Sequence, residues 1–554
     1  MKFLLKLALV PLFALTAVSL PLSSAVAQAL KPVAVVSIAS IKETLADVDY
    51  ITRAAGMADY GNTARFFTGA MASGIDKERP IGMYFVPQND EFHAVAFMPL
   101  EPNGLATIFK IHKEKLGEPK DLGDGVWEAG TNKSVFIKEQ GGWAFVAENK
   151  EGLKVLPQDP STLLGDLPKS YNFAAKLFVQ NIPEKLKRTG LDEIKLGIER
   201  FLDSPAARQG KIDRDQARQM TAVYVANIEK LANEAEELYI GFGINEASKH
   251  TVLDIGFAAK EGTSLASSMA MQVDATTNFA GFALPEAAIT MNLSSKAGPD
   301  DIAQTAAAMN AARAQWFKLV DDAPEIPADK REAIKAILGP LFGIIEKTVA
   351  TGQLDGGAVV VLLPKSLSFA GGGAVADGAE VEKVLKSIAD GGKDVANFPK
   401  LQLNYGSLGD LKLSRLTAPI PDRNREARDI LGDQLEIIVG VGPKTVIVAG
   451  GREAEGLLKK VLDSSTQQPN KAVSPFNLSI ALLPILKFSK SFDENPIVSD
   501  LIAALERSGG DHIVVANRPG ARSNITRIEI QEGVIQAIGD TAKRTMARQQ
   551  RGAQ

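Results

Sequence analysis

The chain has 554 residues, of which 45% are hydrophobic and 23% charged, a balance typical of globular proteins with a buried core. Lys and Arg total 62 against 66 Asp and Glu, a formal net charge of -4. This balance removes the electrostatic case for nucleic acid as the main partner, because such binding depends on a basic face, and it leaves a local basic patch open. There is no cysteine, so disulfides, thiolate catalysis and Cys-ligated metals are excluded.

The chain begins with the pattern of a secretory signal peptide. Two lysines precede an apolar run over 7–20, and the small residues Ala25 and Ala27 precede a cleavage expected before Gln28. The apolar run is short for a membrane-spanning helix, and no later run approaches about 18 apolar residues. We therefore predict a signal peptide over 1–27, no transmembrane span after its removal, and a periplasmic, cell-surface or extracellular location. An uncleaved amphipathic anchor is the alternative.

Pairs of apolar runs around polar turns recur along the chain. They lie at 81–86 with 92–97, 135–138 with 143–147, and 238–244 with 251–258. Segments with helical spacing follow them, for example 105–111 and 263–271, and 41–71 has helical spacing broken near Gly56 and Gly61. A helix can cover the apolar side of a preceding hairpin. We therefore predict an α+β fold with an antiparallel sheet and helices on one face.

The first half of the chain is echoed, in the same order, by the second half. The strand, strand and helix pattern of 125–156 returns at 435–462, and four shorter phrases also pair: 35–40 with 290–295, 84–87 with 361–364, 170–173 with 474–478, and 238–241 with 512–515. Ordered self-similarity over a long period predicts an internal duplication. We expect repeat domains at 28–275 and 276–545, with a boundary near 274–278, followed by a basic polar tail at 546–554. The alternative is that the echoes arise without a duplication, because the strands and helices of α+β proteins have similar sequence patterns.

The first repeat contains an insertion with a long amphipathic pattern. Apolar residues recur at helical spacing over 194–239: Met220, Tyr224, Ile228, Leu231, Ala235 and Leu238. We predict one long helix that packs on its own domain. A partner helix or a lid over an apolar ligand is the alternative interpretation.

The four histidines, His93, His112, His250 and His512, show no metal-ligand spacing, and we interpret them as ordinary surface or core residues. Asp511 precedes His512, but neighbouring residues of a strand point to opposite faces, so we do not predict an acid-base pair. No G-x-S-x-G or S-x-x-K motif occurs. The sequence therefore predicts no catalytic, cofactor-binding or metal-binding residue.

Two glycine-rich segments need a separate interpretation. The segment 440–445 resembles a phosphate-binding loop, but Pro443 removes a backbone N–H, and the segment connects two strands. We predict a hairpin turn. Gly371, Gly372 and Gly373 precede a helical pattern, but the matching place in the first half is a strand, so we predict a close-packed or bulged strand rather than a phosphate cradle.

The leader, the phrase 117–127 and the phrase 142–147 resemble those of uncharacterised secreted proteins of planctomycete-type bacteria. The resemblance implies export and supplies no functional residue. We therefore expect an exported, non-catalytic binding or structural protein of unknown ligand and without a cofactor, with a protein or a lipid as the partner classes. Two alternatives stay open: an exported hydrolase whose site is assembled only in space, and a carrier of an apolar ligand between the two repeats.

Overall fold

The structure is a computed structural model that describes residues 30–552, apart from 89–90, 132, 205–213, 324–326 and 393–398. The described chain forms two compact units. Unit 1 contains residues 30–50, 59–204 and 225–244, and unit 2 contains residues 51–58, 214–224 and 245–552. The predicted signal peptide and its cleavage residues Ala25, Ala27 and Gln28 lie outside the described residues. The repeat boundary near 274–278 stays a prediction.

Unit 1 is built on one antiparallel sheet. The strands alternate between buried and partly exposed residues, which is the pattern of a pleated sheet covered mainly on one side. The order of its strands is β9 (Ala235–Asn245), β8 (Phe173–Leu177), β1 (Ala34–Ile38), β2 (Ile81–Gln88), β3 (Glu91–Pro99), β7 (Trp143–Ala147), β6 (Val135–Gln140), β5 (Val126–Ala129) and β4 (Lys120–Asp121).

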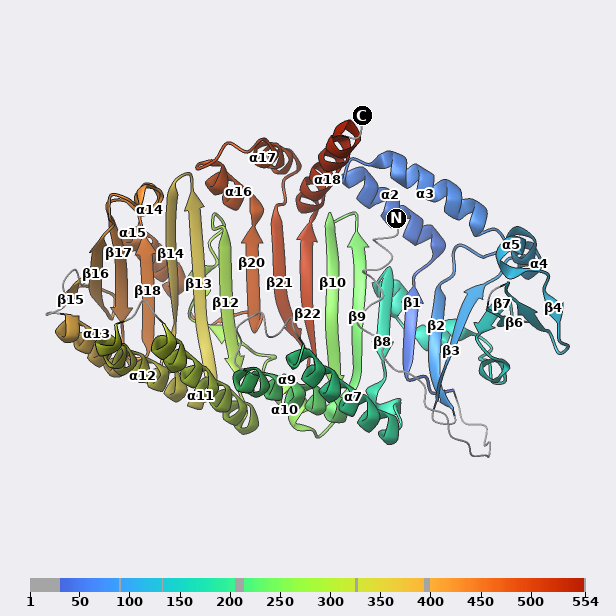
Figure 1. The fold of residues 1–554 in the computed structure, drawn as a ribbon, viewed down its shortest axis with the longest axis horizontal. Helices are drawn as coiled ribbons and strands as arrows, with labels where there is room; N and C mark the ends of the chain where they lie inside the picture. Colours follow the sequence, from blue (N-terminus) through green and yellow to red (C-terminus); the bar gives the residue numbers. More distant parts are fainter. Residues whose placement is uncertain are drawn as a thin grey trace. The chain divides into compact units, whose positions relative to one another are not determined.

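Unit 2 is also built on one large antiparallel sheet, whose strands stand side by side in Figure 1. Its order is β10 (His250–Ala259), β22 (Ser523–Gln531), β21 (His512–Pro519), β20 (Phe476–Ala481), β12 (Ile289–Lys296), β13 (Gln353–Leu363), β14 (Ser366–Ala374), β18 (Thr445–Gly451), β17 (Gln434–Val441), β16 (Leu411–Pro419) and β15 (Lys400–Leu408). The short strands β11 (Thr276–Thr277) and β19 (Lys471–Ala472) form a separate pair.

The strand order of unit 1 recurs inside unit 2. Each strand of unit 1, read across the sheet from β9 to β4, matches one strand of unit 2, read from β21 to β15. Matching strands have matching neighbours in the sheet and follow one another in the same order along the chain. The α+β class with antiparallel strands is therefore confirmed. The shared order supports the predicted duplication, which stays a prediction about the ancestry of the two units.

The helices of unit 1 connect its strands. They are α2 (Ile41–Ala54), α3 (Ala58–Met71), α4 (Gly104–Ile111), α5 (Lys113–Leu116), α6 (Leu167–Ser170), α7 (Glu184–Leu202) and α9 (Arg214–Glu234), with 3-10 turns η1 (Lys150–Leu153), η2 (Pro160–Leu164) and η3 (Val179–Asn181). Of these helices, the end of α2, the first residue of α3 and the first half of α9 are assigned to unit 2. The predicted single helix over 194–239 is wrong, because β9 begins at Ala235. From there the apolar residues Leu238, Ile240 and Phe242 alternate as in a strand.

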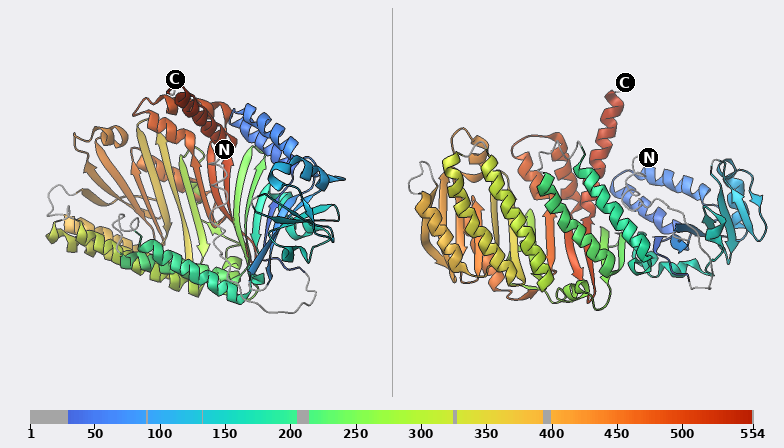
Figure 2. Two further views of the ribbon diagram at one scale, coloured as in Figure 1. Left: turned by 45° about the vertical axis from the view of Figure 1, so that its right-hand side comes forward. Right: turned by 60° about the horizontal axis from the view of Figure 1, so that its bottom comes forward.

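The helices of unit 2 lie at both ends of its strands and on its faces (Figures 1 and 2). They are α10 (Ser264–Ala270), α11 (Pro299–Asp322), α12 (Ala328–Ala350), α13 (Gly378–Gly392), α14 (Arg425–Leu431), α15 (Ala454–Thr466), α16 (Leu482–Lys490), α17 (Pro496–Ser508) and α18 (Glu532–Gly552), with the 3-10 turn η4 (Ala280–Phe282). The predicted basic tail thus begins within α18.

The main core of unit 2 lies on one face of the sheet. Leu458 and Val461 of α15 and Phe282 of η4 pack on Ile438 and Ile447, all nearly inaccessible to solvent. We call this the covered face. The corresponding core of unit 1 joins Val35, Tyr84 and Phe145 to Leu153 of η1 and Leu164 of η2, and it defines the covered face of that unit.

Helices also contact the opposite face, which differs from the predicted arrangement with helices on one face. In unit 2, Ile344 of α12 and Val381 and Val384 of α13 pack on Val439 and Val441 near the end of β17. These valines alternate with Ile438, so they point away from the covered face. Figure 2 (right) shows α11 and α12 on the near side of the strands. Both faces of the strands are apolar here, so both attract helices.

Candidate functional site

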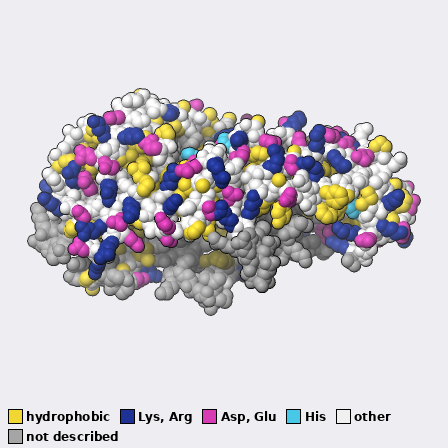
Figure 3. Space-filling view, turned by 90° about the horizontal axis from the view of Figure 1, so that it is seen from above, with side chains coloured by type: hydrophobic (Ala, Val, Ile, Leu, Met, Phe, Trp, Pro, Cys, Tyr) yellow, Lys and Arg dark blue, Asp and Glu magenta, His cyan; other side chains and the backbone are white. Residues whose placement is uncertain are grey.

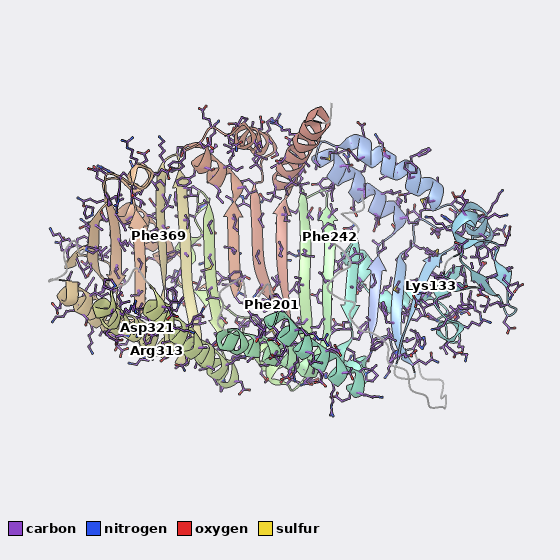
Figure 4. All side chains as sticks on the ribbon, in the orientation of Figure 1. Lys133, Phe201, Phe242, Arg313, Asp321 and Phe369 are labelled. Carbon is purple, nitrogen blue, oxygen red and sulfur yellow. The ribbon has the colours of Figure 1, made fainter. Side chains whose placement is uncertain are left out.

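The opposite face of unit 2, which we call the open face, carries a row of apolar side chains that crosses the whole sheet. Residues paired in register on antiparallel strands point to the same side. The row follows the registers from β10 to β15: Thr251, Ile530, Ile513, Ile480, Ile289, Val360, Phe369, Gly450, Ile437, Leu416 and Leu401. Phe369 is labelled on β14 in Figure 4. The row contains no charged side chain.

A second row lies two residues away on the same face. It runs through Leu253, Ile528, Val515, Leu478, Met291, Ala358, Gly371, Val448, Val439 and Ser414. A Cβ atom added at Gly371 would meet nothing closer than 3.9 Å. The row is therefore low at Ala358 and Gly371, between the larger side chains of Met291 and Val448.

The two faces differ in solvent exposure. On the covered face Val359 is 1% exposed and Ile438 0%, whereas their neighbours Val360 and Ile437 on the open face are partly exposed. Ile255 of β10, on the open face, is 50% exposed. An antiparallel sheet with one solvated face normally carries polar residues there. The open face of unit 2 is instead apolar and incompletely covered, which makes it the candidate functional site.

Unit 1 has a comparable row on the face opposite its core. The registers join Ile240, Ala175, Val36, Met83, Ala96, Val146, Ile137 and Trp127 from β9 to β5. Phe173 and Phe242, paired on β8 and β9, belong to the same face, and Phe173 is 40% exposed. At the β5 to β7 end this face is covered by Leu105 and Ile108 of α4.

Two pairs of a histidine and a carboxylate lie near the ends of β10, β22 and β21. His250 Nδ1 lies 2.8 Å from Glu529 Oε1, and His512 Nδ1 lies 2.9 Å from Asp511 Oδ1. Gln531 separates the two pairs, because it is paired in register with His250 and its side chain accepts from the His512 backbone N–H. The contacts of the two imidazoles among the described residues are with these carboxylates.

The Asp511 and His512 pair corrects the sequence interpretation. We expected adjacent strand residues to point apart, but β21 begins at His512, and Asp511 lies in the segment before it. Its carboxylate can therefore turn toward the imidazole, while its other oxygen accepts from the Leu483 backbone N–H at 2.7 Å. The other two histidines lie in unit 1 and have different partners. The His93 ring contacts the Asn149 side chain, and the His112 ring contacts the Met71 carbonyl oxygen.

A buried ion pair lies between the neighbouring strands β10 and β22. The Arg527 guanidinium donates to Asp254 Oδ1 at 2.7 Å and to Oδ2 at 2.6 Å, and the Asp254 side chain is fully buried. Such a bidentate ion pair joins two strands in a fixed register. We interpret it as structural, because both carboxylate oxygens already accept hydrogen bonds.

The groups with shifted pKa values do not gather at one place. A hydrogen bond from the Glu78 backbone N–H, together with Arg79, lowers the pKa of Asp76, and Arg428 lowers the pKa of Asp433. Burial raises the pKa of Tyr84, whose hydroxyl lies in the core of unit 1. Within the described part of the chain, no three His, Asp or Glu side chains are arranged to hold a metal ion.

The glycine-rich segments adopt the predicted structures. Residues 440–445 connect β17 to β18 as a hairpin, and Gly371, Gly372 and Gly373 lie within β14. Gly372 is required by packing, because an added Cβ would lie 2.6 Å from Ile447 Cγ1. The sequence did contain a signal for the open face: β13 has consecutive apolar residues from Val359 to Leu363, where a sheet with one polar face would alternate.

Comparison with family models, with curated proteins and with solved structures found no match.

Proposed function

We propose that this chain is an exported, non-catalytic protein that binds an apolar ligand of the acyl-chain type on the open face of unit 2. The observation that carries the proposal is the row of apolar side chains registered across the sheet from β10 to β15 and left partly exposed. A ligand without hydrogen-bonding groups along its length matches this face, since Thr251 at the β10 end is the one residue of the row with a polar side chain.

The small residues Ala358 and Gly371 leave a depression in the second row, which favours a narrow ligand such as an acyl chain. Met291 and Val448 stand on either side of it in the same row, and a carbon atom at the Cβ position of Gly371 would meet nothing closer than 3.9 Å. Burial of the half-exposed aliphatic groups against such a chain contributes roughly 25 cal/mol per Å² of apolar area removed from water.

Export rests on the pattern of the first residues, with two lysines, an apolar run and the small residues before Gln28. N-terminal sequencing of the protein recovered from the periplasm or medium should begin at Gln28. Recovery only from the cytoplasm, with Met1 retained, would contradict this part of the proposal.

The binding proposal is tested by lipid extraction and by titration. Purified protein should yield co-purified acyl-chain lipid by mass spectrometry, and the delipidated protein should bind a fluorescent fatty acid. In Met291→Lys and Val448→Lys, an ammonium group enters the face beside Gly371, so the affinity for the probe should fall about tenfold or more. These positions are partly exposed, so the fold should tolerate the substitutions.

Gln402→Lys is the matched control. Gln402 is exposed on β15, on the side of the sheet that faces away from the row, because it is paired with Arg415, which is paired with Ile438. It adds the same charge and should leave the affinity unchanged. An extract without lipid, or equal losses in the control and in the two open-face variants, would refute the proposal.

A further inference from the structure

Helix α3 of unit 1 buries small residues and exposes large apolar ones. Its inward positions are small: Gly61 is buried and Ala64 and Thr68 are partly buried, followed by buried Ala72. Its large residues point outward, with Phe66 74% exposed and Phe67 59% exposed. A surface helix of a globular protein normally buries its large apolar residues and exposes polar ones.

The exposed large residues of α3 form one apolar area, which we call the α3 patch: Tyr60, Phe66, Phe67 and Met71, the first and last being 61% and 47% exposed. Phe66 and Phe67 contact each other edge to face, with ring centroids 5.7 Å apart. Figure 3 shows hydrophobic side chains gathered over this helix in the view from above.

The α3 patch is held on a fixed base. Arg65 forms an ion pair with Asp49 of α2 at 2.6 Å. At the other end of α3, His112, at the end of α4, contacts the Met71 carbonyl oxygen at 2.9 Å, and the chain at Gly74 lies so close to Gly104 that neither position has room for a side chain. The exposure of the aromatic rings is therefore a property of the folded unit.

The area of the α3 patch fits a membrane surface better than a protein partner. An aromatic side chain offers on the order of 150–250 Å², so the patch exposes roughly 400–500 Å². A stable protein interface needs about 800 Å² from each partner. Insertion into a bilayer has no such minimum, because each ring that enters the lipid gains its transfer energy separately.

Charges beside the α3 patch favour an anionic membrane. His112 lies between α4 and α5. The last residues of α4 are the exposed Lys110 and Ile111, which is 43% exposed, and α5 contains the exposed Lys115. Neither lysine forms an ion pair among the described residues. Basic side chains next to inserted aromatic rings attract anionic headgroups.

We propose that the α3 patch docks this protein onto the surface of a bilayer that contains anionic phospholipid, with Phe66 and Phe67 inserted and Lys110 and Lys115 at the headgroups. This inference stands apart from the ligand of unit 2, since it uses other residues and a different unit.

The test uses the full mature chain and vesicles of phosphatidylcholine with phosphatidylglycerol. The wild type should sediment with the vesicles, and Phe66→Ser with Phe67→Ser should weaken binding about a hundredfold, since each buried ring accounts for about tenfold. Lys110→Glu with Lys115→Glu should weaken it about thirtyfold or more and reduce its dependence on salt. Phe201→Ser, at a 64% exposed position on α7, is the matched control and should bind like the wild type.

A second measurement protects the test from misfolding. The Phe66→Trp variant should keep the binding, and its tryptophan emission should shift to the blue and be quenched by spin-labelled lipid. Absence of vesicle binding by the wild type, an equal loss in Phe201→Ser, or an emission of the Phe66→Trp variant that vesicles leave unchanged would each overturn the proposal. Self-association of the wild type that the double serine variant abolishes, without vesicle binding, would assign the patch to a second copy and would also overturn it.

Discussion

Units 1 and 2 arrange corresponding strands in the same order, but they close their apolar faces to different extents. In both units the covered face is sealed by the segment between two strands, η1 and η2 in unit 1 and α15 in unit 2. On the other face, α4 covers β5 to β7 of unit 1, whereas α12 and α13 cover only one end of the strands of unit 2. Both units therefore share a sealed core on the covered face, and they differ in how far helices cover the other face.

The largest effect on stability is expected from the buried ion pair of Asp254 and Arg527 in unit 2. In Asp254→Ala, Arg527 loses both acceptors at a half-buried site, so unit 2 should be destabilised by about 3–5 kcal/mol. Urea unfolding followed by hydrogen exchange should show β10 and β22 opening earlier, with β1 to β3 of unit 1 unchanged. His250→Gln, at a partly exposed pair with Glu529 nearby, is the control, and a shift of less than about 1 kcal/mol for Asp254→Ala would contradict the structural role.

The next effect should be equal in the two units. An added Cβ would lie 2.4 Å from Phe97 Cζ at Gly82 of unit 1, and 2.6 Å from Ile447 Cγ1 at Gly372 of unit 2. Gly82→Ala and Gly372→Ala should each destabilise their own unit by about 1–3 kcal/mol, because a packed core has to shift. Thermal unfolding of the two variants measures this, and a clear effect in only one unit would break the likeness of the covered faces.

Gly371 is the matched position on the open face of the same strand. Gly371→Ala should leave the stability within about 0.5 kcal/mol, because the new Cβ meets nothing closer than 3.9 Å. Gly371→Leu should retain the fold but lower the affinity for a fluorescent fatty acid several-fold, by filling the low point of the row. A Gly371→Ala variant as unstable as Gly372→Ala would show that the open face is covered.

The smallest effect is a pH dependence in unit 1. The pKa of Asp76 is lowered, chiefly by the hydrogen bond from the Glu78 backbone N–H and then by Arg79. A lowered pKa means that the stabilisation is complete above the unfolded value near 4 and is lost as the pH falls through the folded value. Asp76→Asn should therefore cost about 0.5–1 kcal/mol at pH 7. The difference from the wild type should shrink below pH 4, and a difference independent of pH would contradict it.

Local patterns in the sequence predicted much of the fold. The alternation in 81–97 predicted the hairpin of β2 and β3, and the context of Gly371 predicted a strand rather than a phosphate cradle. Where interaction partners are far apart in sequence, prediction failed. The open row joins residues as distant as Thr251 and Ile530, and its existence depends on registers that no local pattern specifies.

The errors have local physical causes. The helical stripe was extended past Glu234 because Ala235 and Leu238 fit both a helical and an alternating pattern, and the pairing of β9 with β8 decides for the strand. The contact of Asp511 with His512 was missed because it depends on where the strand begins, and boundaries are the least predictable feature of an element.

The partly exposed aliphatic row also has a consequence for handling the protein. A molecule stripped of its ligand would present this surface to other molecules, so it should aggregate more readily and adsorb to glass and plastic. Occupancy would then show first as colloidal behaviour: preparations that keep their lipid should stay monodisperse on concentration, and those extracted with detergent should not.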